Sequence, residues 1–234
     1  MKTIIGIIGG MGPMATCDLM KKIILHTDAG SDQEHLHILV DCNTNIPDRT
    51  AAIINNGESP LLEMIKSALR LQAMGAQALV VACNTAHFFL KDLKKYINIP
   101  IISILHETAV HLHHRGFHSV AVLGTYGTIR SGVYGNALTS MDISCTYPNE
   151  EDQQFIMSLI YDYVKAGKDY PHPEKVHAMV NRLKAQGVQA LVLGCTELPI
   201  LFAKMDVTLP IIDPTVVLAC AAIRFADGNL KVIR

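Results

Sequence analysis

Apolar residues along this chain fall into two alternating patterns. Short continuous runs are typical of parallel strands covered on both faces. They occur at residues 3–8, 37–40, 78–82, 100–103, 119–123, 190–194 and 209–213, and a further strand is predicted near residues 143–147. Longer segments with apolar residues three or four positions apart indicate helices. One such segment begins at Pro13, and the others span residues 59–74, 85–96, 150–166, 174–186 and 215–225.

The second half of the pattern repeats the first. Residues 70–78 match residues 182–190 position for position without a gap, and each copy leads through an apolar run to a cysteine, Cys83 or Cys195. Such self-similarity is the sign of a duplicated structural unit. We expect an α/β protein with two similar domains, each a four-stranded, mostly parallel sheet flanked by helices. A pseudo-twofold axis would relate the domains, with the site between them.

The domain boundary is predicted near residue 102. The first half would comprise residues 1–102 and carry Cys83, and the second would comprise residues 103–213 and carry Cys195. The C-terminal helix within residues 214–234 is expected to return to the first half. No linker is rich in Gly, Ser or Pro, which favours halves that pack together.

Composition narrows the class of protein. Of 234 residues, 50% are hydrophobic and the formal net charge is −1, with acidic and basic residues interspersed. Nothing indicates a basic surface for nucleic acid. The apolar runs are too short to span a membrane, and residues 1–8 lack the pattern of a signal peptide. We therefore expect a cytoplasmic protein. Its six cysteines show no close disulfide spacing, so most of them are expected to be reduced thiols.

The repeated cysteines suggest a specific chemistry. Ligands of open α/β sheets bind beyond the carboxyl ends of the strands, where Cys83 and Cys195 fall. A following helix would stabilise a thiolate there through its N-terminal N–H groups. Two thiols facing one carbon atom would supply a base on one side and an acid on the other, which is the arrangement needed to invert a stereocentre.

The other cysteines and several histidines are expected to have structural or surface roles. Packing is the ordinary role of a lone cysteine, and we assign it to Cys17, Cys42, Cys145 and Cys220. An exposed helix and its loop are expected to carry His111, His113, His114 and His118.

Three parts of the sequence partly fit a cofactor site: one for zinc, one for a dinucleotide and one for pyridoxal phosphate. Cys83 and His87 have zinc-ligand spacing, but the second copy has Pro199 in place of a histidine. Residues 10–15 fit a G-x-G-x-x-A dinucleotide pattern, with Asp41 as the ribose-binding acid, yet this leaves the repeated cysteines unexplained. Lys165 lacks a nearby phosphate-binding glycine loop for pyridoxal phosphate. We expect neither a metal nor a cofactor.

Three motifs now carry a resemblance: residues 9–13 (GGMGP), 83–85 (CNT) and 194–197 (GCTE). They are similar to the signatures of the aspartate/glutamate racemase superfamily, whose members are two-thiol enzymes without a cofactor. The resemblance covers essentially the whole chain. It implies that Cys83 and Cys195 are the two bases, that Asn84, Thr85 and Thr196 bind the α-amino and α-carboxylate groups, and that the protein is a homodimer.

Two cations place the chain within that family. Arg49 and Lys165 match the basic pair of the aspartate-specific branch, which implies that they bind the distal carboxylate of a dicarboxylic amino acid. A guanidinium grips a carboxylate with two bonds and an ammonium adds a compact charge. Met14 and Thr125, in the loops after the first strand of each half, are expected to line the pocket.

Two alternatives stay open at this point. Maleate isomerase and hydantoin racemase also use paired cysteines, and arylmalonate decarboxylase keeps one of them. A protein that binds an acidic amino acid without catalysis would need the same cleft.

Overall fold

The computed structural model describes residues 3–231, so the terminal residues 1–2 and 232–234 of the predicted domains lie outside the description. The chain divides into two compact units. One contains the chain up to Glu107 together with the segment from Thr215 onward, and the other contains Thr108–Pro214. The chain passes from the first unit to the second between Glu107 and Thr108, inside helix α5 (Ile104–His114) and a few residues beyond the predicted boundary.

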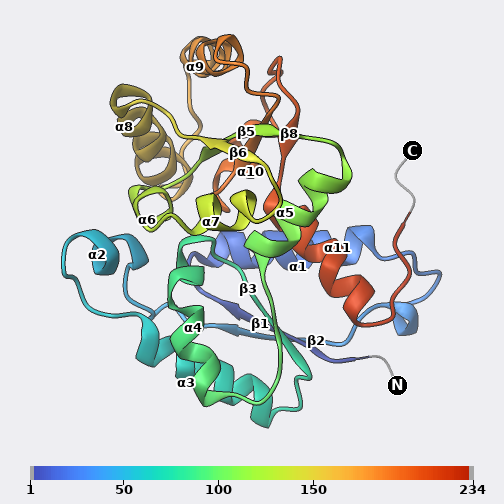
Figure 1. Cartoon of the computed structure of the whole chain (residues 1–234). Coiled ribbons are helices and arrows are strands. Elements are labelled where there is room, and N and C mark those ends of the chain that lie inside the picture. The colour runs from blue at the N-terminus through green and yellow to red at the C-terminus, as the bar shows by residue number, and fades with distance from the viewer. Residues whose placement is uncertain (1–2, 232–234) are drawn as a thin grey trace. The chain divides into compact units, whose positions relative to one another are not determined.

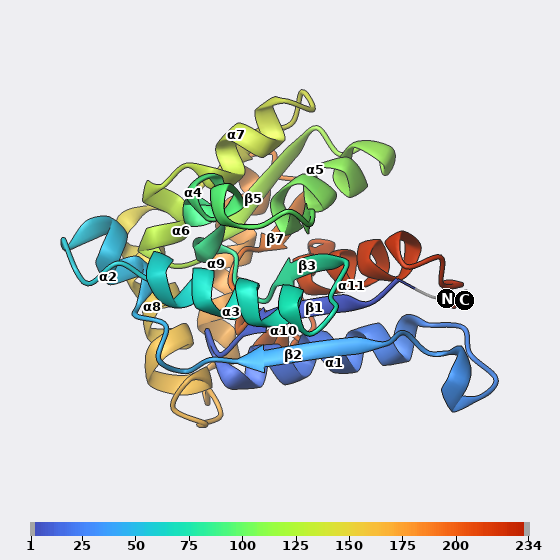
Figure 2. The ribbon, with the colours of Figure 1, turned by 90° about the horizontal axis from the view of Figure 1, so that it is seen from below.

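The first unit is built on four parallel strands in the order β2-β1-β3-β4. They are β1 (Ile5–Gly9), β2 (Ile38–Cys42), β3 (Ala78–Val81) and β4 (Ile101–Ile102). Helix α3 (Leu61–Ala73) covers one face, and α1 (Pro13–His26) and α11 (Pro214–Phe225) cover the other (Figures 1 and 2). The shorter helical pieces are η1 (Asp32–Glu34), α2 (Arg49–Ile54), η2 (Thr85–Phe89), α4 (Leu90–Leu93) and η3 (Lys94–Tyr96).

The second unit repeats this topology, with parallel strands in the order β6-β5-β7-β8. They are β5 (Ser119–Leu123), β6 (Ser144–Thr146), β7 (Ala190–Leu193) and β8 (Ile211–Ile212). Helices α8 (Glu150–Ser158), α9 (Pro173–Ala185) and α10 (Leu198–Phe202) share one hydrophobic cluster with β5 and β7. The remaining helices are α6 (Tyr126–Arg130), α7 (Val133–Thr139) and the π-helix η4 (Leu159–Val164) (Figure 1).

The predicted fold class is confirmed, and every named strand pairing is parallel rather than mostly so. Strands β1 and β3 are buried along their whole length, as expected for strands covered on both faces. Residues 215–231 belong to the first unit, where Thr27 pairs with Leu230. The twofold relation between the halves stays a prediction.

Two predicted helices differ from the structure. Residues 85–96 form three short pieces, because the His87 ring bonds the Cys83 carbonyl while the His87 N–H bonds Asn84 instead. The predicted helix 150–166 changes at Leu159 into a π-helix, in which the N–H of Lys165 reaches back five residues to Ile160. In residues 3–231, no helix has both the length and the apolar character needed to cross a membrane.

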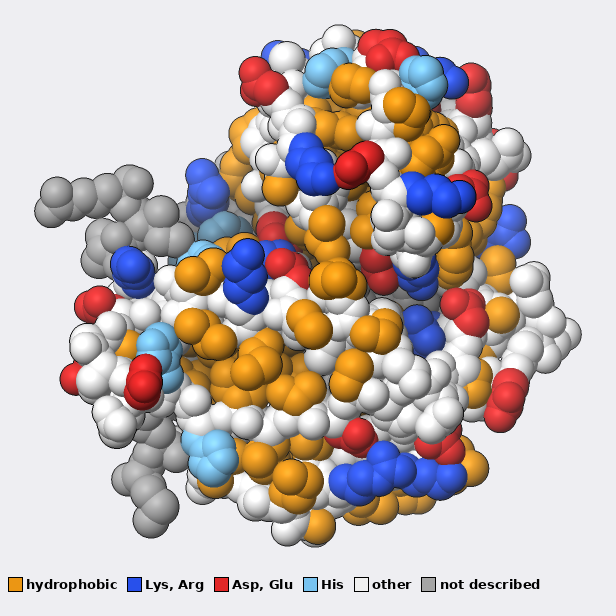
Figure 3. Space-filling model, turned by 180° about the vertical axis from the view of Figure 1, so that it is seen from behind, with side chains coloured by type: hydrophobic (Ala, Val, Ile, Leu, Met, Phe, Trp, Pro, Cys, Tyr) orange, Lys and Arg blue, Asp and Glu red, His pale blue; other side chains and the backbone are white. Residues whose placement is uncertain are grey.

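Helix α1 exposes apolar side chains on its outer face, namely Met14, Met20, Ile24 and Leu25. Figure 3 shows apolar side chains gathered on the side of the molecule it presents. Exposed apolar area of this kind is one place to look for a protein interface. The homodimer implied by the family resemblance stays a prediction, which the mass of the particle in solution would decide.

Gly10 closes the turn between β1 and α1 in a conformation that only glycine adopts easily. Its φ is +86°, and a Cβ there would lie 2.3 Å from the carbonyl oxygen of Asn43, in the loop after β2. The loops that follow β1 and β2 therefore touch through backbone atoms.

His87 ties the loop after β3 to the start of α5. Its Nδ1 lies 2.9 Å from the Cys83 carbonyl oxygen, and its Nε2 accepts the N–H of Ile104 at 3.2 Å. Because Nε2 accepts, the proton must sit on Nδ1. Burial lowers the pKa of His87 from 6.5 to about 4, so the ring is neutral in the folded protein near neutral pH.

We predict that Gly10→Ala lowers the free energy of unfolding by about 3 kcal/mol or more, since left-handed strain and overpacking add. Gly75→Ala is the matched control: it has φ +101° in the same unit, and its nearest neighbour, the Ile4 side chain, is 4.0 Å away. It should lose only the strain, about 1–2 kcal/mol. Urea unfolding measures both, and equal losses would contradict the backbone contact.

We also predict that His87 makes stability depend on pH. A histidine whose pKa is lower in the folded state contributes its full stability above 6.5, and this falls as the pH drops toward about 4. The loss by pH 4 is up to about 3 kcal/mol. His87→Gln, which cannot take up the proton, should flatten this part of the unfolding free energy profile. Replacement of the exposed His113 by Gln should leave the slope as in the wild type, and equal slopes in all three proteins would refute the assignment.

Candidate active site

The strand order of each sheet identifies where a ligand would bind. From β1 the chain passes to β2 on one side and then to β3 on the other, so the loops after β1 and β3 diverge. In open α/β sheets, ligands bind in the crevice at such a switch point, beyond the carboxyl ends of the strands. In the second unit, β5 and β7 flank the equivalent point.

Both repeated cysteines lie at these switch points. Cys83 follows β3, whose last residue Val81 pairs with Ile8. Cys195 follows β7, whose last residue Leu193 pairs with Leu123. Each cysteine is therefore two residues past the last pair with the first strand of its sheet. The sequence repeat is thus also a repeat in strand register.

Each thiol is mostly buried at the edge of its own unit's core. Cys83 is 6% exposed and belongs to the hydrophobic cluster of the first unit, and Cys195 is 7% exposed and belongs to that of the second. Asn84, Thr85 and Thr196, the predicted substrate-binding neighbours, are buried beside them. The residues predicted to handle the α-groups thus directly adjoin the thiols.

The helices after the cysteines are shorter than expected. Both η2 and α10 contain five residues, and η2 is a 3₁₀-helix. A short or tightened helix has a small dipole, and stabilisation of a thiolate by the N-terminal N–H groups of these segments stays a prediction.

Arg49 lies at the start of α2 with its side chain turned toward the loops of the first unit. Its Nη1 donates to the carbonyl oxygens of Ile46 at 3.3 Å and Pro47 at 3.0 Å, and its Nη2 donates to that of Met11 at 3.3 Å. The residue is 8% exposed. These bonds hold the guanidinium between the loops that follow β1 and β2.

Met14 lies on the first turn of α1 and is 69% exposed, whereas Met11 in the preceding loop is buried. Of the two methionines, Met11 contacts the loop that carries Arg49, through its carbonyl oxygen. A pocket-lining role for Met14 stays a prediction.

Glu197 organises the thiol of the second unit. Cys195 Sγ donates to Glu197 Oε2 at 2.9 Å, and the hydroxyl of Thr196 donates to the same oxygen at 3.2 Å. Burial, followed by the negative charge of Glu197, raises the pKa of the Cys195 thiol well above its ordinary value, and Lys165 acts weakly in the opposite direction. Cys195 is therefore a protonated thiol in this arrangement.

Lys165 reaches the same carboxylate from the other side. Its Nζ lies 4.0 Å from Glu197 Oε1 and 4.4 Å from the centre of the Tyr161 ring. The π-helical turn before it adds one residue per turn and so changes the direction in which the Lys165 side chain leaves the helix. The lysine and the second thiol thus belong to one group of side chains.

Thr125 caps helix α6 with its side chain, which accepts the N–H of Thr128 at 3.2 Å. The preceding carbonyl, that of Gly124, accepts Gln153 Nε2 from α8 at 2.9 Å. These bonds fix the loop that follows β5. Because β5 pairs with β7, this loop leaves the sheet beside the one that carries Cys195.

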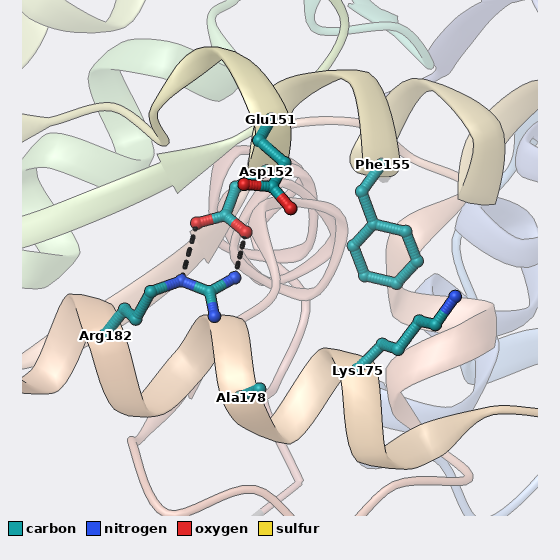
Figure 4. A pocket seen from close by; sticks show the side chains of 6 residues that line it. All are labelled: Glu151, Asp152, Phe155, Lys175, Ala178 and Arg182. Carbon is teal, nitrogen blue, oxygen red and sulfur yellow. Dashed lines mark hydrogen bonds and ion pairs between the residues drawn. The ribbon is translucent and has the colours of Figure 1, made fainter.

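Helix α8 is held in turn by α9. Asp152 accepts both the Nε of Arg182, at 3.2 Å, and its Nη2, beside a pocket of about 310 Å³ (Figure 4). Figure 4 shows Arg182 extended toward Asp152, with Lys175 on an earlier turn of α9. The Asp152–Arg182 pair at this pocket thus fastens two helices, one of which positions the loop of Thr125.

The predictions for the other cysteines and for the candidate cofactor sites have different outcomes. All six cysteines are free thiols, but Cys17 and Cys42 are exposed, so the packing role assigned to them is wrong. Both ring nitrogens of His87 bond backbone groups, which leaves the zinc pairing with Cys83 without support. Among residues 3–231, no cluster of three or more His, Cys, Asp or Glu side chains is placed to hold a metal. Asp41, the candidate ribose-binding acid, pairs with Arg70 at 2.9 Å.

Sequence reasoning missed two residues of these sites, Glu197 and His87 in its positioning role. Glu197 is the last residue of the GCTE motif and lies where the first copy has Thr85, but the sequence assigns it no role. Its contact with Cys195 depends on side-chain geometry that no spacing rule describes.

Known proteins resemble this chain over nearly its whole length. An aspartate racemase from Picrophilus torridus is 33% identical, with a TM-score of 0.83 over 98% of this chain and 96% of that one. An aspartate racemase homologue from Pyrococcus horikoshii is 26% identical, with a TM-score of 0.80 over 97% of this chain and 100% of that one. The broad-specificity amino-acid racemase RacX of Bacillus subtilis is 26% identical over 92% of this chain and 94% of its own length. The Asp/Glu/hydantoin racemase family model matches residues 8–222, and the chain therefore belongs to the Asp/Glu/hydantoin racemase family.

Proposed function

We propose that this protein interconverts L- and D-aspartate by proton transfer at Cα between two cysteines, without a cofactor. The observation that carries the proposal is the equal position of Cys83 and Cys195 in strand register, each at the switch point of its sheet. Membership of the racemase family and the similarity to an aspartate racemase support the reaction class.

In the proposed reaction, one cysteine as thiolate removes the Cα proton and the other as thiol delivers a proton to the opposite face. The electron pair of the broken C–H bond passes into the α-carboxylate, which becomes enolate-like. Because no cofactor delocalises this charge, hydrogen-bond donors must stabilise it. Asn84, Thr85 and Thr196, buried next to the thiols, are the donors we assign to the α-groups.

Arg49 and Lys165 are assigned to the distal carboxylate, with Met14 and Thr125 at the pocket wall. Arg49 is held by three carbonyl groups, so its orientation is already set before a substrate arrives. A preset guanidinium loses little entropy when it binds a carboxylate.

A second candidate is a racemase of broader amino-acid specificity. The observation that favours it is that both cations already have protein partners: Arg49 bonds carbonyls, and Lys165 faces Glu197. The similarity to RacX points the same way. A panel of amino acids with and without a second carboxylate separates the two.

We predict that L-aspartate in deuterated water yields D-aspartate carrying deuterium at Cα, measured by chiral chromatography and mass spectrometry. Cys83→Ala and Cys195→Ala should each lower the racemisation rate by roughly 10²–10⁴-fold, since each removes one acid–base group. Cys17→Ala, which alters an exposed thiol, should keep the wild-type rate. Thermal stabilisation by aspartate without racemisation would instead identify a binding protein.

We further predict that Arg49→Gln and Lys165→Met raise KM for aspartate about 10-fold or more, because each removes a charge-assisted contact of about 1.5–3 kcal/mol. Turnover of an amino acid without a distal carboxylate, such as alanine, should change little if it occurs. Lys168→Met removes an exposed lysine close to Lys165 in the sequence and should leave both kcat and KM for aspartate unchanged. Equal effects of Arg49→Gln and Lys165→Met on both substrates would show that the pair does not read the distal carboxylate.

A further inference from the structure

The two cysteine loops are not chemically equal, although both follow their strands in the same register. After Cys83 come Asn84 and Thr85, whereas after Cys195 come Thr196 and Glu197. The second copy thus has a buried acid where the first has a threonine, since Glu197 is 5% exposed.

The Glu197 carboxylate collects three groups. Its Oε2 accepts the thiol of Cys195 at 2.9 Å and the hydroxyl of Thr196 at 3.2 Å, while its Oε1 faces the Lys165 ammonium at 4.0 Å. An anion that accepts a hydrogen bond from a thiol favours the protonated form of that thiol. A buried carboxylate in turn needs compensating donors and positive charge, which Thr196 and Lys165 supply.

We propose that Glu197 is a positioning residue that keeps Cys195 as the proton-donating thiol of the pair, with Lys165 balancing its charge. The inference rests on the proposed two-thiol reaction and goes beyond it by assigning the starting roles: Cys195 begins as the acid and Cys83 as the base.

The proton balance follows directly. When the Cα–H bond breaks, its proton goes to the sulfur of Cys83, and the Cys195 S–H bond breaks as a new Cα–H bond forms on the opposite face. Cys195 is then a thiolate beside the Glu197 carboxylate, and Cys83 is a thiol. Once the product has left, Cys83 gives up its proton to solvent and Cys195 takes one from solvent, a change that the repulsion between the Cys195 and Glu197 anions favours. Lys165 lessens that repulsion during the step.

Steady-state comparison of the two directions cannot test this arrangement. L- and D-aspartate have equal free energies, so kcat/KM must be the same in both directions whatever the roles of the cysteines. The thiol itself has to be observed.

The experiment is alkylation of the full-length protein with iodoacetamide across a pH series, with Cys195 modification quantified by peptide mass spectrometry. Glu197→Gln should move the midpoint of Cys195 alkylation to lower pH by about one unit, equivalent to roughly tenfold more thiolate at a given pH below the midpoint. Glu197→Asp keeps the charge and should hold the midpoint near that of the wild type. Glu151→Gln, an exposed acid of the same unit, should leave it unchanged.

A purely structural role for Glu197 gives a different result. Loosening of the loop would raise the alkylation rate at every pH without moving the midpoint, and that outcome in a folded Glu197→Gln protein overturns the proposal. Should Glu197→Gln fail to fold, Lys165→Met decides, because loss of the ammonium should move the midpoint upward, and no shift or a downward shift contradicts the proposal. A shifted midpoint in a protein without racemase activity would uphold the thiol–carboxylate pairing and reject the reaction instead.

Discussion

Parallel pairing of β3 with β1, and of β7 with β5, is the constraint on which the rest of this molecule depends. It sets where each cysteine leaves its sheet, because Val81 and Leu193 pair with Ile8 and Leu123 and the chain turns two residues later. A slip of one residue would turn each strand's side chains to the opposite face of its sheet. Register, more than the cysteines' own contacts, brings a thiol to the switch point of each sheet.

On this repeated frame the side chains have diverged. The loop after β3 is fixed by a neutral imidazole bonded on both sides to backbone, whereas the loop after β7 is fixed by a carboxylate bonded to a thiol and a hydroxyl. Position 87 in the first copy corresponds to Pro199 in the second, and Thr85 corresponds to Glu197. The same strand register can thus present two thiols in different electrostatic surroundings, as acid–base chemistry with unlike partners requires.

Sequence reasoning predicted the strands, the long helices and the place of both cysteines, because these follow from apolar periodicity and from an ungapped repeat. It did not predict the broken helix after Cys83, where the His87 ring bonds the Cys83 carbonyl and also accepts the N–H of Ile104, from a segment that no local periodicity connects to it. Nor did it predict how Lys165 leaves its helix, because a π-turn has no periodic signal. The bond from Cys195 to Glu197 was hidden for a related reason: two residues so close in sequence rarely face each other in regular structure.

The division of the chain carries a consequence for the order of assembly. Thr108–Pro214 is one continuous stretch, but the first unit needs the segment from Thr215 onward, in which the N–H of Lys231 bonds the carbonyl of His26 and Leu230 pairs with Thr27. During synthesis, the ribosome makes the whole second unit before the segment that completes the first. The part of the protein that begins first is therefore finished last, and until then the sheet face that α1 and α11 share lacks the helix α11.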